Sequence, residues 1–204
     1  LSVYDFHREG SFTSGIQEAV NALPPEGGIV SIPVGTYQLG RSITLRSSVK
    51  LKGQGELTVI TRRDPYVEVW LTQPARKTEQ IVVVEDSSGF MVGTEVMVSN
   101  SKTPWNQKTH AIIDFIEGNR VGLDRGLRGD CLPQSGAMMV NSFPAIRASA
   151  GANIRVEDLL IDGRMGDADK DQSTDSRCEC LLKRHNILRK SAGRVIDIMI
   201  RSIL

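Results

Sequence analysis

Very short apolar strands separated by turns dominate the first third of the chain. Apolar and polar residues alternate within residues 27–33, 34–39, 42–45, 49–55 and 58–60, and glycine or proline recurs between these runs. Strands of roughly three to five residues, with a turn about every eight residues, are typical of a sandwich, a barrel or a β-solenoid. The pattern therefore predicts an all-β fold and leaves these three architectures open.

The last part of the chain favours the solenoid. Residues 153–163, 185–188 and 193–200 again place polar residues between aliphatic ones, and Ile196, Ile198 and Ile200 share one strand face. Such strands fill a narrow core with their inner face. Parallel coils stacked about 4.8 Å apart satisfy this pattern with short strands and polar corners.

Helical periodicity is clear once, near the start of the chain. Ile16, Ala19, Val20 and Leu23 recur at spacings of three and four, which places them on one helix face. Thr13 or Ser14 is the expected N-cap, and the two prolines at 24–25 end the helix. The sequence therefore predicts one short amphipathic helix.

Four segments near the N-terminus resemble the opening module of the pectate lyase superfamily. They read SVYDF at 2–6, GIQEAV at 15–20, GIVSIPVGTY at 28–37 and VKLKGQG at 49–55, and the likeness resumes with ANIRVEDLLIDG at 152–163. The resemblance implies an all-β, right-handed parallel β-helix with one N-terminal capping helix. It also implies an extracellular or periplasmic protein that acts on or binds a polysaccharide. The chain departs from the family at residues 9–15, where the usual acidic loop is absent, and it lacks the catalytic motifs of family polygalacturonases and pectate lyases.

A stretch between the two matching regions has a pattern of its own. Apolar runs at 81–84, 88–98 and 110–116 are followed by a tight turn at 117–120 and a return strand at 121–123. These runs predict a small β-barrel-like subdomain inserted between coils. The expected organisation is an N-terminal cap with the first coils in 1–79, the inserted subdomain in 80–141 and further coils in 142–204. The insertion has either an architectural role or a role as a contact surface.

The polar segment from residue 162 to residue 175 holds the candidate site residues. Asp162 ends an expected strand and lies next to Arg164, so the two are candidate catalytic residues, although Asp162 and Gly163 also fit a simple turn. Asp167, Asp169 and Asp171 alternate and could converge on a calcium ion, which accepts six to eight oxygens. The spacing does not match an EF-hand loop, and a solvated surface loop explains the same charges.

Charge and hydropathy limit the partners of the chain. The formal net charge is +1, which argues against binding nucleic acid or an anionic membrane by bulk charge, and no apolar run is long enough for a spanning helix. Residues 176–204 nevertheless carry seven Lys and Arg residues against two acidic ones. The isoleucines of this segment and Leu204 predict self-association through the C-terminal coils, because an uncapped coil exposes apolar surface and strand edges.

Two functional hypotheses follow from the resemblance. The first is a polysaccharide-active or glycan-binding β-helix protein, acting on or binding an acidic polysaccharide, with lyase and hydrolase chemistry both open. The second is a catalytically silent structural or tailspike-like β-helix, or an N-terminal fragment of one, that self-associates to form a homo-oligomer. The absent catalytic motifs favour the second hypothesis.

Overall fold

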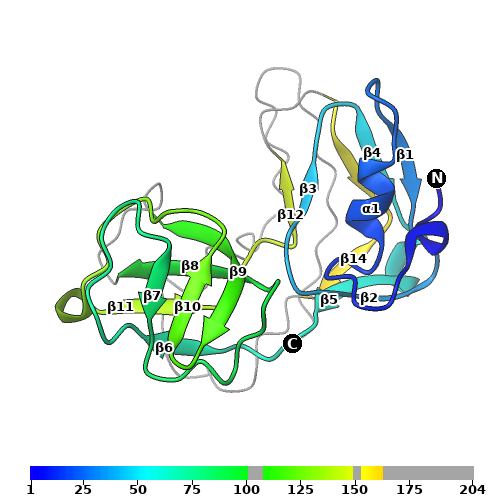
Figure 1. The fold of residues 1–204 in the computed structure, drawn as a ribbon. Helices are drawn as coiled ribbons and strands as arrows, with labels where there is room; N and C mark the ends of the chain where they lie inside the picture. Colours follow the sequence, from blue (N-terminus) through cyan, green and yellow to red (C-terminus); the bar gives the residue numbers. More distant parts are fainter. Residues whose placement is uncertain (101–107, 149–152, 163–204) are drawn as a thin grey trace. The chain divides into compact units, whose positions relative to one another are not determined.

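The computed structural model describes residues 1–100, 108–148 and 153–162. The described chain is all-β apart from one six-residue α-helix and short 3₁₀ turns (Figure 1). It divides into two compact units. Unit 1 is formed by Leu1–Asp64 and the segment that begins at Pro144, and unit 2 is formed by Pro65–Phe143.

Among its described residues, unit 1 contains three small sheets in which every pairing is parallel. The first sheet joins β1 (Gly28–Ser31), β4 (Val49–Lys52) and β13 (Arg155–Glu157). The second joins β2 (Gly35–Leu39), β5 (Thr58–Arg62) and β14 (Leu160–Asp162). The third pairs β3 (Ile43–Leu45) with β12 (Ile146–Ala148). A 3₁₀ turn, η2 (Gly55–Leu57), precedes β5. The chain visits the three sheets in the same order on each pass.

The register of these sheets stacks apolar residues from successive passes. Val30 pairs with Leu51 and Leu51 pairs with Val156, while Ile60 lies between Tyr37 and Ile161 in the second sheet. All of these side chains are buried. The short alternating strands expected from the sequence are therefore confirmed here, with their apolar faces in one core.

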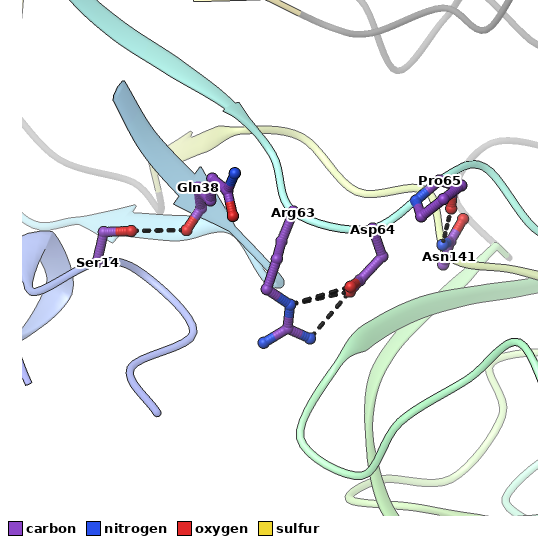
Figure 2. Close-up of polar contacts among 6 residues, drawn as sticks. All are labelled: Ser14, Gln38, Arg63, Asp64, Pro65 and Asn141. Atoms are coloured by element: carbon purple, nitrogen blue, oxygen red, sulfur yellow. Dashed lines mark hydrogen bonds and ion pairs between the residues drawn. The ribbon is translucent and has the colours of Figure 1, made fainter. Parts of the chain in front are cut away.

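The helix α1 (Ile16–Asn21) buries Ile16, Ala19 and Val20, as its periodicity predicts. The expected N-cap at Thr13 or Ser14 is wrong, because the cap is Gly15 with φ 84° and no side-chain capping bond. The Ser14 hydroxyl instead donates to the Gln38 carbonyl of β2 at 2.8 Å (Figure 2). A preceding 3₁₀ helix, η1 (Val3–Phe6), contacts α1. Ser14 thus fastens the start of the helix to β2.

Unit 2 is one antiparallel sheet of six strands. In sheet order these are β6 (Glu68–Trp70), β11 (Ala137–Val140), β8 (Glu95–Asn100), β9 (Thr109–Glu117), β10 (Arg120–Leu123) and β7 (Ile81–Val83). The two edge strands meet, because Leu71 bridges Val84 and the Glu85 amide donates to the Trp70 carbonyl at 3.0 Å. The sheet therefore closes around its own core of buried aliphatic side chains, and a 3₁₀ turn, η4 (Pro133–Ser135), precedes β11.

Asn141 ties together the two ends of unit 2. Its side-chain amide donates to the Pro65 carbonyl at 2.6 Å (Figure 2). Its Oδ1 accepts from the Val67 amide at 2.9 Å. Its backbone N–H also donates to the Val67 carbonyl at 3.1 Å. Asn141 itself is only 2% exposed, and its two side-chain hydrogen bonds are partly buried.

None of the helices in the described ranges has the length and apolar character needed to cross a membrane.

Candidate functional site

The structure places one of the site residues expected from the sequence. Asp162 is the last residue of β14, is half-buried, and pairs in register with Thr61 of β5. Arg164, Asp167, Asp169 and Asp171 lie outside the described residues. The catalytic pair and the calcium site therefore stay predictions. Within the described ranges, no group of three or more His, Cys, Asp or Glu side chains is placed to hold a metal ion.

A groove of about 490 Å³ lies on unit 2, and we call it the unit 2 groove. It is lined by three acidic residues, Glu79, Asp114 and Asp124, by Gln80, and by the apolar residues Ile81, Phe115 and Leu123. Its volume lies within the range of about 300–1,000 Å³ that is usual for small-molecule sites. Apolar walls with a few placed polar groups are likewise the usual composition of such sites.

A β-bulge in β9 creates the floor of this groove. Gly122 of β10 pairs with Phe115, but Leu123 pairs with Ile113, so Asp114 is an extra residue without a partner in the ladder. Ile113 is buried in the core and Ile116 packs against that core. Asp114 and Phe115, which lie between them, consequently both line the outer groove.

Gly122 makes room for the aromatic ring on this floor. A Cβ at position 122 would overlap the Phe115 ring, with its Cζ only 2.6 Å away. The ring therefore occupies the space that a side chain at 122 would fill. The neighbouring strand supplies Ile81, which is 38% exposed beside Gly122 in the register. The result is an apolar surface open to the groove.

Hydrogen bonds fix the carboxylate of Asp124 at the rim. Its Oδ1 accepts from the Ile112 amide at 2.8 Å, and its Oδ2 accepts from Arg125 Nη2 at 2.7 Å. Partial burial would raise the pKa of Asp124, but the Arg125 and Ile112 hydrogen bonds outweigh it and hold the pKa below its ordinary value. Asp124 is therefore an anion at neutral pH.

This lowered pKa predicts a loss of stability in acid. The ionised carboxylate is favoured in the folded state, so its contribution is present above the unfolded pKa of about 3.9 and is lost as the pH falls through the lower folded pKa. Urea unfolding of the wild type and Asp124→Asn from pH 7 to pH 3 measures this. The stability advantage of the wild type should shrink toward pH 3, and an advantage that is the same at every pH would contradict the assignment.

The loop that carries Glu79 is held by its backbone. Glu79 Oε2 accepts from the Arg76 amide at 2.8 Å, and the Glu79 carbonyl accepts from the Leu127 amide at 2.9 Å. Thr78 adopts a positive φ of 73°, and a Cβ at Gly126 would clash with the Thr78 carbonyl. The loop is thus positioned by close packing at Gly126, so the groove is largely preformed.

Two buried groups of unit 2 do not belong to the groove lining. The side chain of Glu95 is only 6% exposed, and its Oε1 lies 3.6 Å from His110 Nδ1. Cys131 lies in the core, where burial raises the pKa of its thiol to about 11. Cys131 is therefore protonated at neutral pH, and a protonated thiol is not a nucleophile, because the thiolate is the reactive form.

A cluster of two arginines and one phenylalanine lies on unit 1. The guanidinium carbons of Arg63 and Arg41 lie 4.6 Å and 5.3 Å from the centre of the Phe12 ring. Arg63 also pairs with Asp64 through Nη2 and Oδ2 at 2.9 Å (Figure 2). The Gly40 amide donates to the Phe12 carbonyl at 2.8 Å. We assign this cluster a structural role, because it fastens the loop before α1 to the ends of β2 and β5.

The unit 2 groove was not anticipated from the sequence. Its residues come from three separated stretches, and the runs at 81–84 and 110–116 predict strands without showing which side chains meet. One signal was available. Ile113 and Ile116 are three residues apart in a strand, whereas regular alternation places core residues two apart, so a bulge between them could have been inferred.

Comparisons with known proteins give only distant likenesses. No protein-family model matches the chain, and no curated protein matches it. Among solved structures, the chain is similar to the tailspike of Pseudomonas phage phi297, with 14% identity over 74% of this chain and 32% of that chain and a TM-score of 0.34. It is also similar to the tailspike of Acinetobacter baumannii bacteriophage AP22, which was solved with an A. baumannii capsular saccharide. The identity is 11% over 66% of this chain and 31% of that chain, and the TM-score is 0.35. It is similar to the tailspike of Pseudomonas phage LKA1, with 15% identity over 73% of this chain and 31% of that chain and a TM-score of 0.33. The chain spans about a third of the length of each tailspike, and at these TM-scores the likeness assigns neither a fold nor a function.

Proposed function

We propose that the chain is a glycan-binding protein in which unit 1 forms the first coils of a right-handed parallel β-helix. The three parallel sheets of unit 1 support the β-helix, because successive passes of the chain add one strand to each sheet in a fixed order. The helix α1 takes the place of the N-terminal cap. The motifs shared with the pectate lyase superfamily support the same architecture.

The inserted subdomain in this proposal is unit 2, a small β-barrel-like module. It begins at Pro65 because β6 pairs with β11 and so belongs to the closed sheet. Its insertion point lies between β5 and β12. A module of this kind can carry a binding surface while the coils supply a scaffold.

The unit 2 groove is the observation that carries the proposed binding function. A sugar ring has one apolar C–H face and a rim of hydroxyls, so it fits a floor made by Phe115 and Ile81 with carboxylates at the edge. Carboxylates such as Asp114 accept hydrogen bonds from hydroxyl groups. The packing around Gly122 and Gly126 preforms the groove and lowers the entropic cost of binding.

Catalysis and the calcium site remain parts of the proposal that depend on residues near the C-terminus. Asp162 with Arg164 would supply the acid–base chemistry, and Asp167, Asp169 and Asp171 would hold the ion. The second candidate function is a catalytically silent, tailspike-like β-helix that forms a homo-oligomer through its C-terminal coils. The absence of the family's catalytic motifs favours this alternative.

Binding of the full chain to an array of neutral, acidic and amino-containing polysaccharides tests the proposed function. We expect retention of at least one class, and a Phe115→Ala variant should lose it. Exposed Tyr4 of unit 1, replaced by alanine, is the matched control. A chain that binds no glycan on the array would contradict the proposal.

Assays of uronic acid polymers for unsaturated products, with and without calcium, separate an enzyme from a binding protein. Turnover that depends on Asp162 and on calcium would support lyase chemistry. Glycan binding without turnover would support the silent alternative.

A further inference from the structure

We propose that the unit 2 groove selects a sugar unit that carries a free ammonium group. This inference rests on the proposed glycan-binding function and specifies the ligand chemistry of its groove. It differs from the acidic polysaccharide that the family resemblance implies, and the difference comes from the charges that line the groove.

The lining of the groove is acidic. Three of its residues are the carboxylates Glu79, Asp114 and Asp124, and among the described residues no Lys, Arg or His lines it. A uronic acid bound there would place its carboxylate near this cluster, and like charges at close distance repel. An ammonium group would gain the corresponding attraction.

The three carboxylates are not equivalent. Asp124 is paired with Arg125, and Glu79 accepts the Arg76 amide of its own loop. In the described part of the chain, no group donates a hydrogen bond to the Asp114 carboxylate, and Asp114 is exposed. Asp114 is therefore the carboxylate best placed to pair with a ligand cation.

The bulge brings this carboxylate next to the aromatic floor. Asp114 and Phe115 are consecutive residues that both line the groove, because the extra residue in β9 interrupts the alternation. A sugar ring resting on Phe115 would thus bring an amino substituent within reach of Asp114. This pairing of a ring platform with an adjacent carboxylate matches an amino sugar.

Calorimetry with three soluble oligosaccharides of equal length tests the inference. The probes are a β-1,4-linked glucosamine oligomer, its N-acetylated form and an oligogalacturonate. For the wild type at low salt we expect the glucosamine oligomer to bind at least about fivefold more tightly than the N-acetylated form, since one ion pair near water contributes about this factor. The oligogalacturonate should bind most weakly. Added salt should reduce the preference.

Two variants of β9 make the test specific. Asp114→Asn keeps the size of the side chain and removes its charge. The affinities of this variant for the two hexosamine oligomers should therefore lie within about twofold of each other. Glu117→Gln, three residues along the same strand and outside the groove lining, should leave the preference unchanged. Both residues are exposed, so both variants should fold, which circular dichroism verifies.

The outcomes separate the inference from the function on which it rests. Equal binding of the two hexosamine oligomers by the wild type, or an unchanged preference in Asp114→Asn, would overturn the ammonium selection and leave glycan binding intact. Tighter binding of the oligogalacturonate, abolished by Phe115→Ala, would also overturn it. Failure to bind any glycan on the array would instead refute the proposed function.

Discussion

Replacing Gly27 by alanine is expected to unfold unit 1 or to leave it only marginally stable. Gly27 has φ 97°, and a Cβ at this position would clash with the backbone carbonyl of Ser48. That carbonyl also accepts the Gly28 amide at 2.9 Å, at the start of the β1–β4 ladder. Backbone strain costs about 1–3 kcal/mol and overpacking about 1–3 kcal/mol more, a large part of the 5–15 kcal/mol that stabilises a typical protein. Urea unfolding followed by circular dichroism measures the loss.

Gly10 provides the matched control for this substitution. Its φ of 83° is also positive, but no atom lies within 4 Å of an added Cβ. Gly10→Ala should therefore show the cost of backbone strain alone, without the clash. If Gly27→Ala is no more destabilising than Gly10→Ala, the close approach of the chain at Ser48 is wrong.

Replacing Asn141 by alanine is expected to destabilise unit 2 by about 1–3 kcal/mol. The substitution removes two partly buried hydrogen bonds and leaves the Val67 amide and the Pro65 carbonyl without their side-chain partner. A hydrogen bond within a protein contributes about 0.5–1.5 kcal/mol to stability. Thermal unfolding of the full chain, with amide exchange at Val67 as a local readout, measures the effect.

Asn119 is the comparison residue for this prediction. Its side chain donates to the Glu85 carbonyl at 2.9 Å in an exposed position, where water can replace the lost donor. Asn119→Ala should cost about 0.5–1 kcal/mol. Equal losses for the two variants would show that burial of Asn141 adds nothing to the stability of unit 2.

Much of unit 1 could be predicted from the sequence. Strand positions followed from the alternation of residues such as Val30 and Ile32, because the inner face of a short strand must be apolar. The helix followed from the spacing of Ile16, Ala19 and Val20. The N-cap was predicted wrongly because Ser14 bonds Gln38, which lies 24 residues away, and local capping preferences do not report such a partner.

The groove depends on contacts that the sequence does not display. Its floor exists because Gly122 lies beside Phe115 in the next strand, and its rim because Glu79 and Asp124 are brought to the same edge of the closed sheet. Local patterns specify which residues form strands, whereas strand register decides which side chains become neighbours. The candidate residues after Asp162 were chosen by charge spacing alone, which carries no information on register.

The hydrogen bonds that Asn141 makes to Pro65 and Val67 affect which insertions and replacements the chain can accept. Since Pro65 and Asn141 are hydrogen-bonded, unit 2 begins and ends at nearly the same point. Many residues separate β5 from β12 in the sequence, but the path between the two ends of unit 2 is short. A module whose two ends lie this close together can be lost, exchanged or duplicated without altering the hydrogen bonding of β5 and β12. The junction between Pro65 and Asn141 is therefore a position at which a different module could replace unit 2 and leave the strands of unit 1 in place.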